Sequence, residues 1–564
     1  MAEMNTTRRQ FLKVAGAAGA TTFLAACGGG SAAPAEDEAE GEGEAEGEAT
    51  PEPETEPAAS GPVEGGDLIV ALSYEPDTTN VYATHLLGDV QAMMLEGLLV
   101  PNAQMEYVPK LAKEVPTVEN GLIELHDDGT MDITYHLQEG VKWHDGEPLT
   151  SADVAYTWEA LSNPDWEAES KDGVADIDSI DCPDDLTVVC HYNKQNPDFA
   201  QCLFTFGIMP KHCIEGVDLN DPTNSYDSFP IGTGPYKFVE WKRGEYIKLE
   251  KNADYWQDGA YMDSVTWLFV TDENTRINYM KTGEANFTYG ISYTNYDQVQ
   301  NIEGMNTITH GLNSWRYCDF NCTIPGLDDV AVRRAISCSI NKQGLVDQLF
   351  SGLPTPCDQP WMPSDPFHVE GFTTQWSYDP DHAKQLLDEA GWVEGADGIR
   401  EKDGTKLSFV VGSAEGRQEM NDIALVLRDN LKSIGIDTSA ETYASSTWTS
   451  MMWDGEYELG VGGYITSPGA SRTLFYASDG YLNRGKWVNE AFDEASYKID
   501  SEMSEEGRKA LVEECLAAFD DTLPQIVLYA STEIDVVTQA LQGFEPNPTN
   551  MTNFCQSEGW WLQQ

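Results

Sequence analysis

The densest group of chemistry-bearing side chains lies in the segment VKWHDGEPLTSADVAYTWEAL, which begins at Val141. Its histidine and two of its carboxylates, His144, Asp145 and Glu147, are residue types that serve as general acid and general base in enzymes. A hydrolytic site of this kind also needs a nucleophile within reach of the histidine. The sequence places no nucleophile near His144, so the cluster alone does not make a catalytic centre.

The elements around this cluster assign its polar residues to backbone roles. Alternating apolar and polar residues predict a half-buried strand over 131–137. Asp145 precedes a glycine, which is typical of a turn, and Thr150 with Asp153 has the spacing of a capping box that opens a helix. We therefore predict a structural role for His144. The chain also lacks G-x-S-x-G, HExxH, P-loop and GxGxxG motifs, and the sequence favours a protein that is not an enzyme.

The bulk composition argues against a nucleic-acid-binding protein. The chain has 564 residues, a formal net charge of −62 at pH 7 and a pI near 4.2. Binding to phosphate backbones requires a basic surface, which such a chain does not offer. The length exceeds one ordinary domain and predicts two or three lobes. A hydrophobic content of 41% is sufficient for cores of that size.

The first 27 residues read as an export signal. Thr6–Lys13 reads TTRRQFLK, and its paired arginines precede an apolar run that ends at Ala26 and is too short for a membrane span. The segment resembles a twin-arginine signal. LAAC at 24–27 resembles a bacterial lipobox, in which Cys27 carries the lipid. Residues 28–66 lack Lys and Arg and predict a disordered acidic linker, so we expect an extracytoplasmic chain, lipid-anchored to the outer face of the bacterial cell membrane.

The cysteine pattern predicts no metal site. Of the 11 cysteines, ten remain if Cys27 is lipidated, and an even number permits disulfides in an exported protein. Cys318 and Cys322 lie in one predicted strand, where their Cα atoms would be ~13 Å apart and too distant to bridge each other. The sequence has no CxxC pair and no Cys/His cluster at ligand spacing. We expect neither a metal nor a cofactor.

Longer segments carry a resemblance to one protein family. YHLQEGVKWHDGEPLTSADVAYTW at 135–158 and PIGTGPYKFVEWKRGEYIKLEKNADYW at 230–256 resemble signature segments of the extracellular solute-binding proteins of family 5, the oligopeptide, dipeptide and nickel class that serves ABC importers. The resemblance continues in order along nearly the whole mature chain. It includes LEGLLV (95–100), LDDVAVRRAISCSINKQGLV (327–346), YDPDHAKQLLDEAGW (378–392) and LPQIVLY (523–529).

The resemblance implies an α/β fold, namely a type II periplasmic-binding-protein clamshell with two main lobes plus an extra domain, built from mixed sheets with flanking helices. Mapped onto this chain, lobe I takes 67–100, 215–316 and 525–564, the extra domain takes 101–214, and lobe III takes 317–524. The implied function is capture of a peptide-like solute between the lobes and its delivery to ABC permease and ATPase subunits. The implied state is a monomer that touches the membrane by its lipid anchor only.

Ligands of open α/β lobes lie at the carboxyl ends of strands, in the crevice between lobes. Three loops occupy such positions, at 74–86, 322–325 and 457–475. By resemblance, the third begins with a strand that peptide binders offer to the backbone of an extended peptide. The predicted ligand-binding residues are Tyr74, Asn80, His85, Asn321, Trp361, Trp448, Gly460, Gly462, Gly463, Tyr464, Ser467 and Arg472.

The third loop departs from the peptide-binding members. Those members place an aspartate after the strand to pair with the free amino terminus, but here the aligned residue is Ser467 or Tyr464, and no Asp or Glu occurs from Leu459 to Ser478. A buried amino group without a counter-ion is costly. Arg472 is the nearest charge and could instead meet a carboxylate or phosphate. Peptide is the leading solute, and oligosaccharide, metal chelate, an anionic small molecule or a sensory role stay open as alternatives.

Overall fold

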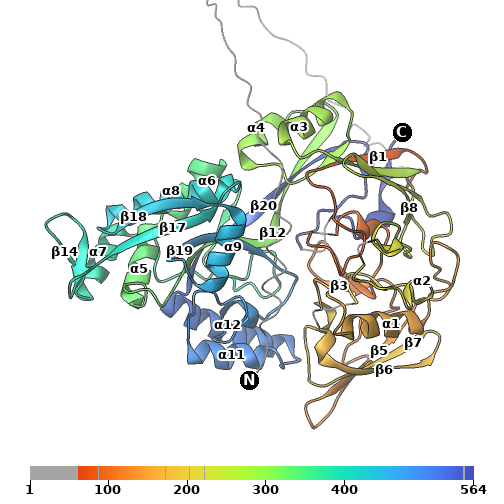
Figure 1. The fold of residues 1–564 in the computed structure, drawn as a ribbon, viewed down its shortest axis with the longest axis horizontal. Helices are drawn as coiled ribbons and strands as arrows, with labels where there is room; N and C mark the ends of the chain where they lie inside the picture. Colours follow the sequence, from red (N-terminus) through yellow and green to blue (C-terminus); the bar gives the residue numbers. More distant parts are fainter. Residues whose placement is uncertain (1–60, 87, 172, 202–203, 222, 550–552) are drawn as a thin grey trace, which may run out of the picture. The chain divides into compact units, whose positions relative to one another are not determined.

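The computed structural model describes residues 61–564, except for 87, 172, 202–203, 222 and 550–552 (Figure 1). The predicted signal peptide, the predicted lipidation site Cys27 and most of the predicted linker lie outside the described residues. Helices and mixed sheets alternate along the described chain, which is the α/β class that the sequence predicts. Within this part of the chain, no helix has the length and apolar character that a membrane span requires.

The largest sheet has eleven strands in the order β18-β17-β19-β12-β20-β11-β1-β10-β9-β8, with β13 paired to β20. It combines parallel pairs, such as β1 with β10, and antiparallel pairs, such as β12 with β20. Its strands are β1 (Asp67–Leu72), β8 (Tyr236–Lys242), β9 (Tyr246–Lys251), β10 (Ser264–Phe269), β11 (Phe287–Thr288), β12 (Met305–Phe320), β13 (Thr355–Pro356), β17 (Ser408–Ala414), β18 (Asp437–Tyr443), β19 (Leu459–Ile465) and β20 (Gln525–Thr538).

A four-stranded sheet of order β4-β5-β7-β6 and three small sheets complete the strands of the described chain. These strands are β2 (Leu99–Pro101), β3 (Tyr107–Pro109), β4 (Ile123–Leu125), β5 (Met131–His136), β6 (Ile177–Asp184), β7 (Thr187–Tyr192), β14 (Val393–Glu394), β15 (Arg400–Lys402), β16 (Thr405–Lys406), β21 (Leu541–Gln542) and β22 (Trp561–Leu562). The α-helices are α1 (Ser151–Ser162), α2 (Lys211–Ile214), α3 (Glu273–Thr282), α4 (Tyr296–Val299), α5 (Val330–Ser339), α6 (Lys342–Phe350), α7 (Pro380–Glu389), α8 (Gln418–Ser433), α9 (Ser445–Asp454), α10 (Thr473–Tyr476), α11 (Glu490–Ile499) and α12 (Glu505–Thr522).

Two long antiparallel strands, β12 and β20, connect the two halves of the large sheet and lie side by side (Figure 1). The first part of β12, Met305–Gly311, pairs with 532–538 in the half that contains β11. The last part, from Trp315, pairs with 525–530 in the half that contains β19. The register shifts between Gly311 and Trp315. We call these two strands the crossover ribbon; the lobe and domain boundaries drawn from the sequence stay a prediction.

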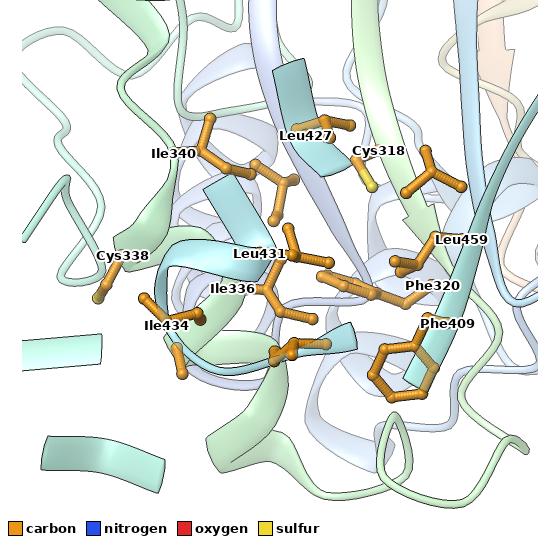
Figure 2. Packing of buried hydrophobic residues seen from close by; sticks show 14 of the residues in the cluster. Cys318, Phe320, Ile336, Cys338, Ile340, Phe409, Leu427, Leu431, Ile434 and Leu459 are labelled. Carbon is orange, nitrogen blue, oxygen red and sulfur yellow. The ribbon is translucent and has the colours of Figure 1, made fainter. Parts of the chain in front are cut away.

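One apolar core fixes the half of the sheet that contains β17 and β19 (Figure 2). Ile423, Leu427 and Leu431 recur at helical spacing on α8 and are fully buried. They pack in one cluster with Phe320 of β12 and Leu459 of β19. Burial of one such side chain stabilises the fold by about 1.5–3 kcal/mol. The core therefore sets the positions of the loops that follow β17 and β19.

Two of the recognisable sequence segments, 95–100 and 230–256, converge on one buried carboxylate, Glu96. Its oxygens accept hydrogen bonds from Thr233 Oγ1 at 2.8 Å, from Tyr255 Oη at 2.7 Å and from Trp256 Nε1 at 3.1 Å. Lys110 Nζ lies 3.4 Å from the same carboxylate, and both side chains are almost completely buried. LEGLLV and the two ends of the 230–256 segment thus meet at a hydrogen-bonding centre of the fold.

His144 and the capping box have the structural roles that the sequence predicts. His144 Nδ1 accepts a hydrogen bond from Gly232 N at 3.2 Å, and its Nε2 lies 3.1 Å from Gly234 O. A neutral ring protonated on Nε2 satisfies both contacts, and burial lowers the pKa of His144 to about 4. At the start of α1, the Asp153 carboxylate accepts from Thr150 N at 2.9 Å.

Candidate functional site

The third predicted loop begins with β19, a strand with one edge that lacks a strand partner over most of its length. β19 pairs with β12 from Leu459 to Ile465. On the opposite edge, β17 reaches only Leu459 and Gly460. Within the described residues, no strand pairs with that edge over 461–465. Backbone N–H and C=O groups on such an edge can pair with an extended ligand.

The glycines of β19 are explained by their packing against protein neighbours. A Cβ at Gly462 would lie 2.5 Å from Tyr317 Oη, and a Cβ at Gly463 would lie 2.6 Å from Arg316 Nη1. At Gly460, the nearest atom would be the sulfur of a buried methionine at 3.0 Å. These glycines make room for side chains of the protein itself, which is a different reason from the close ligand approach that the sequence suggests.

Tyr464 and Ser467 lie beside the crossover ribbon. The ring of Tyr464 stacks on that of Tyr317, with centroids 4.9 Å apart and planes inclined by 30°. Asn313 Nδ2 lies 3.2 Å from the carbonyl oxygen of Thr466 and 3.1 Å from that of Ser467. The structure therefore brings the end of β19 and the residues after it together with the middle of the ribbon.

Arg472 is a buried structural cation rather than a free anion-binding group. Its side chain is 2% exposed, and Nη2 donates to Asp365 Oδ2 at 2.9 Å. Nε donates to the carbonyl oxygen of Pro360, and Nη1 donates to those of Gly469 and Ser471. All three guanidinium nitrogens already donate to protein acceptors, which argues against the prediction that Arg472 binds an anionic solute.

Asn321 and Trp361 also make contacts within the protein that account for their polar atoms. Asn321 Nδ2 donates to the carbonyl oxygens of Gly455 and Tyr457 at 2.9 and 2.8 Å. The Trp361 side chain is fully buried, and its Nε1 donates to Ala470 O at 3.0 Å. Trp361 is one of the predicted ligand-binding residues, but its proline-rich loop folds it into the core, where it packs in one cluster with Trp315 and Tyr317 of β12.

Trp448 lines a cavity of about 200 Å³ beside the first residues of β19. It stacks on Tyr443, with centroids 5.7 Å apart and an interplanar angle of 8°. A Cβ at Gly412 would lie 2.3 Å from the Trp448 ring. The ring therefore packs between strands β17 and β18 and also forms part of the cavity wall.

The three predicted residues of the first loop have partners in several parts of the protein, namely Asp89, Asp227, the loop itself and the predicted extra domain. Tyr74 Oη donates to the Asp89 carboxylate, and Asn80 is completely buried. His85 is exposed, and its Nε2 lies 3.0 Å from the carboxylate of Glu169. Tyr464, Ser467 and Arg472 gather instead around β12, so the predicted residues form two groups rather than one continuous set.

A cavity of about 270 Å³ lies at the middle of the crossover ribbon, and we call it the hinge cavity. Its walls come from the segment after β11, from both strands of the ribbon, from the end of α6 and from the start of α8. The lining residues are Gly290, Ile291, Ser292, Tyr293, Thr294, Leu312, Arg316, Phe350, Gln418, Glu419, Asp422, Ser531, Thr532 and Glu533.

None of the hinge-cavity residues was predicted from the sequence. Glu419 and Asp422 stand at the start of a helix directly after strand β17. Applying the rule for strand carboxyl ends to that strand would have found them. Arg316 and Glu533 come from the interior of long strands. They meet only because the ribbon pairs residues more than two hundred positions apart in the chain, and no local pattern marks them.

A second cavity, of about 440 Å³, lies between segments of the predicted extra domain and of predicted lobe III; we call it the interlobe cavity. Tyr107 and Phe199 line it from the first segment set, and Phe367 lines it from the second. Arg508 Nη1 donates to Asp198 Oδ1 at 2.8 Å across the cavity boundary. Both cavities therefore adjoin segments that the chain brings together from distant positions.

Two groups of possible metal ligands occur in the described residues, with donor atoms within 4.8 Å of one another. Each is also a hydrogen-bonded ion pair: His212 Nε2 lies 2.8 Å from Asp145 Oδ2, and His310 Nε2 lies 3.1 Å from Asp535 Oδ2. Burial opposes the charge on His310, but bonds to Asp535 and Glu533 raise its pKa to about 9. Among the described cysteines, Cys182, Cys213, Cys318, Cys322, Cys338, Cys357 and Cys515 are free thiols. The groups are Asp145, His212 and Cys213, and His310, Glu533 and Asp535.

Comparison with known proteins places these features in context. The profile for "Bacterial extracellular solute-binding proteins, family 5 Middle" matches residues 106–485, and the profile for a twin-arginine translocation signal matches residues 5–25. The oligopeptide-binding protein AppA of Bacillus subtilis is 27% identical over 526 residues, which are 90% of this chain and 93% of AppA. The twin-arginine match indicates export from the cytoplasm.

Two solved structures share the fold. AppA from Bacillus subtilis in complex with a nonapeptide has a TM-score of 0.73 at 26% identity, covering 89% of this chain and 100% of AppA. NikZ from Campylobacter jejuni in complex with Ni(L-His) has a TM-score of 0.73 at 24% identity, covering 88% of this chain and 99% of NikZ. The fold is that of a type II periplasmic binding protein, with mixed sheets and flanking helices, as the sequence predicts.

Proposed function

Because this chain belongs to the bacterial extracellular solute-binding proteins of family 5, we propose that it is the receptor of an ABC importer that captures a peptide-like solute. The solute is bound between the lobes and delivered to the membrane permease. The observation that carries the peptide proposal is the edge of β19 over 461–465, which no strand of the described chain covers. An extended peptide has the backbone groups that such an edge pairs with.

The two cavities support the same proposal. β19 is paired to the strand that lines the hinge cavity, and the loop after it supplies Pro468 and Gly469 to the interlobe cavity. Both cavities are therefore connected to β19 through neighbouring segments of the chain, and a solute bound at β19 could reach them with its side chains. The relative AppA, which is solved with a nonapeptide, is consistent with a solute of several residues.

The first experiment identifies the solute and tests the backbone pairing. Solutes that co-purify with the exported chain are identified by mass spectrometry, and peptides of two to nine residues are screened by thermal unfolding. A peptide at 100 times its dissociation constant is expected to stabilise the chain by about 2.7 kcal/mol. The matched control is the same peptide with N-methyl groups on alternate residues, which removes the backbone donors and is expected to weaken binding at least about tenfold.

Equal affinity of the N-methylated and unmodified peptides would contradict pairing with β19. Stabilisation by a sugar, chelate or anion, with no response to any peptide, would overturn the peptide proposal in favour of the alternatives. The missing acid between Leu459 and Ser478 is the sequence observation that keeps those alternatives open. The pairing of Arg472 with Asp365 argues against an anionic solute.

The lipid anchor and the absence of catalysis are further parts of the proposal. Cys27 of LAAC is proposed to carry the lipid. A Cys27→Ala variant expressed in whole cells is expected to move from the membrane fraction to the soluble extracytoplasmic fraction, as judged by immunoblotting. Retention of the variant on the membrane would contradict the anchor. Chemical conversion of the bound solute during incubation would contradict the proposal that the chain is a binding protein without enzymatic activity.

A further inference from the structure

The hinge cavity contains more negative than positive side chains. Glu419, Asp422 and Glu533 line it, and Arg316 is the one cation among its lining residues. Arg316 Nη2 donates to Glu419 Oε2 at 3.1 Å, and Glu419 Oε1 also accepts from Tyr529 Oη at 2.6 Å. That pair neutralises one carboxylate, while Asp422 and Glu533 have no lining cation of their own.

The groups behind the cavity wall do not remove this excess. His310 Nε2 lies 3.5 Å from Glu533 Oε2, but it lies closer, at 3.1 Å, to the fully buried Asp535. One histidine therefore faces two carboxylates. Asp422 accepts a hydrogen bond from Gln418 Nε2 at 2.7 Å, which is a neutral partner. Glu533 and Asp422 are partly buried. Carboxylates that lose part of their solvation without gaining a counter-ion are costly, and a cation inside the cavity would offset that cost.

The remaining walls suit the stem of a long cationic side chain. Tyr293 and Phe350 lie against each other with centroids 5.1 Å apart, and Leu312 lines the cavity near them. Aromatic rings and apolar walls bind methylene groups and attract a nearby cation. A volume of about 270 Å³ is several times the ~30 Å³ that one water molecule occupies in the liquid.

A peptide residue presents a cationic side chain together with a backbone that can pair with the edge of β19, whereas a free polyamine brings the cation alone. The proposed function therefore favours a residue within a peptide over a free amine as the source of the cation.

From these contacts we propose that the hinge cavity selects a solute with a positively charged group, and that this group is the side chain of a lysine or arginine residue in a peptide. This inference rests on the proposed function and deepens it, since it names the charge of the solute at one position. Glu533 and Asp422 are the residues that determine the preference.

The test compares pentapeptides that differ at one position. Five polyalanine peptides carry lysine at successive positions, and five matched peptides carry norleucine, which has a similar length and no charge. We expect at least about tenfold tighter binding of lysine than of norleucine at one position, measured by isothermal titration of the exported chain; this equals about 1.4 kcal/mol. In Glu533→Gln, in Asp422→Asn and in the double variant, the ratio is expected to fall toward one.

The control variant is Glu494→Gln, which removes an exposed carboxylate on α11, away from the lining residues, and is expected to keep the full preference. Spermidine and free arginine are titrated in parallel. Tighter binding of spermidine than of any lysine peptide, with the same loss in Glu533→Gln, would support the cation and replace the peptide as its source. Equal binding of lysine and norleucine at every position, or a preference that survives the double variant, would overturn the proposal. If no peptide binds, the proposal that the solute is a peptide is wrong. If neither spermidine nor free arginine binds, the inference that the cavity selects a cation is overturned independently.

Discussion

Replacing Arg472 by methionine is expected to lower the free energy of unfolding by about 3–5 kcal/mol. The side chains of Arg472 and Asp365 are 2% and 0% exposed and form a 2.9 Å ion pair. Methionine fills much of the space of the arginine stem but leaves the Asp365 carboxylate buried without a counter-ion. Three carbonyl oxygens also lose their donor. Denaturant-induced unfolding of the purified chain measures the effect.

Two further variants separate the ion pair from the rest of the side chain. In Asp365→Asn/Arg472→Met, both charges are gone, and part of the lost stability is expected to return. Arg428→Met removes a partly exposed surface arginine whose partner is the neighbouring Asp429, and it is expected to cost at most about 1 kcal/mol. Unchanged stability of Arg472→Met together with loss of solute binding would restore Arg472 as a ligand-binding residue.

Gly232→Ala is expected to destabilise the fold by about 3 kcal/mol or more, the range of severe overpacking. A Cβ at Gly232 would lie 1.9 Å from the carbonyl oxygen of Met94. The carbonyl oxygen is a backbone atom and the Cβ is bonded directly to the backbone, so no side-chain rotation relieves the overlap. The same contact positions Thr233 to donate to Glu96. The midpoint of thermal or denaturant unfolding measures the loss.

Gly311→Ala is the matched control for this substitution. A Cβ at Gly311 would have no neighbouring heavy atom within 4 Å, so the change is expected to alter stability by less than about 1 kcal/mol and even to stabilise the chain slightly. If Gly232→Ala is as stable as Gly311→Ala, the segments around 94 and 232 can separate at little cost. That result would mean that the 230–256 segment does not depend on the close contact between Gly232 and Met94.

Much of the fold could be predicted because its local signals agree with its tertiary structure. The strand predicted over 131–137 is β5, and Thr150 and Asp153 form the expected capping box. The helix before Gly283 ends there, with that glycine in the left-handed region. The motif segments indicate the family from the sequence alone. Two of them, 95–100 and 230–256, also meet at Glu96 in a contact between distant segments, which periodicity cannot reveal.

The candidate site was harder to predict because burial depends on tertiary packing. The residue types and loop positions of Trp361 and Arg472 predict contact with a ligand, yet both side chains are in the core. The sequence has no acidic residue from Leu459 to Ser478. The fold nevertheless brings Asp319 of β12 next to β19, opposite Gly460. Burial raises the pKa of Asp319 to about 6, and Tyr457 and Gln525 donate to its carboxylate.

The crossover ribbon has a mechanical consequence. Its two strands are hydrogen-bonded to each other on both sides of the register shift between Gly311 and Trp315. The ribbon that links the halves of the sheet therefore resists stretching and shear. It deforms most easily by twisting about its own axis, because this motion leaves the backbone hydrogen bonds intact. A rearrangement of the two halves would then have a low torsional stiffness at one place. Ribbon residues near that place, such as Arg316 of β12 and Glu533 of β20, would change their relative positions as the ribbon twists.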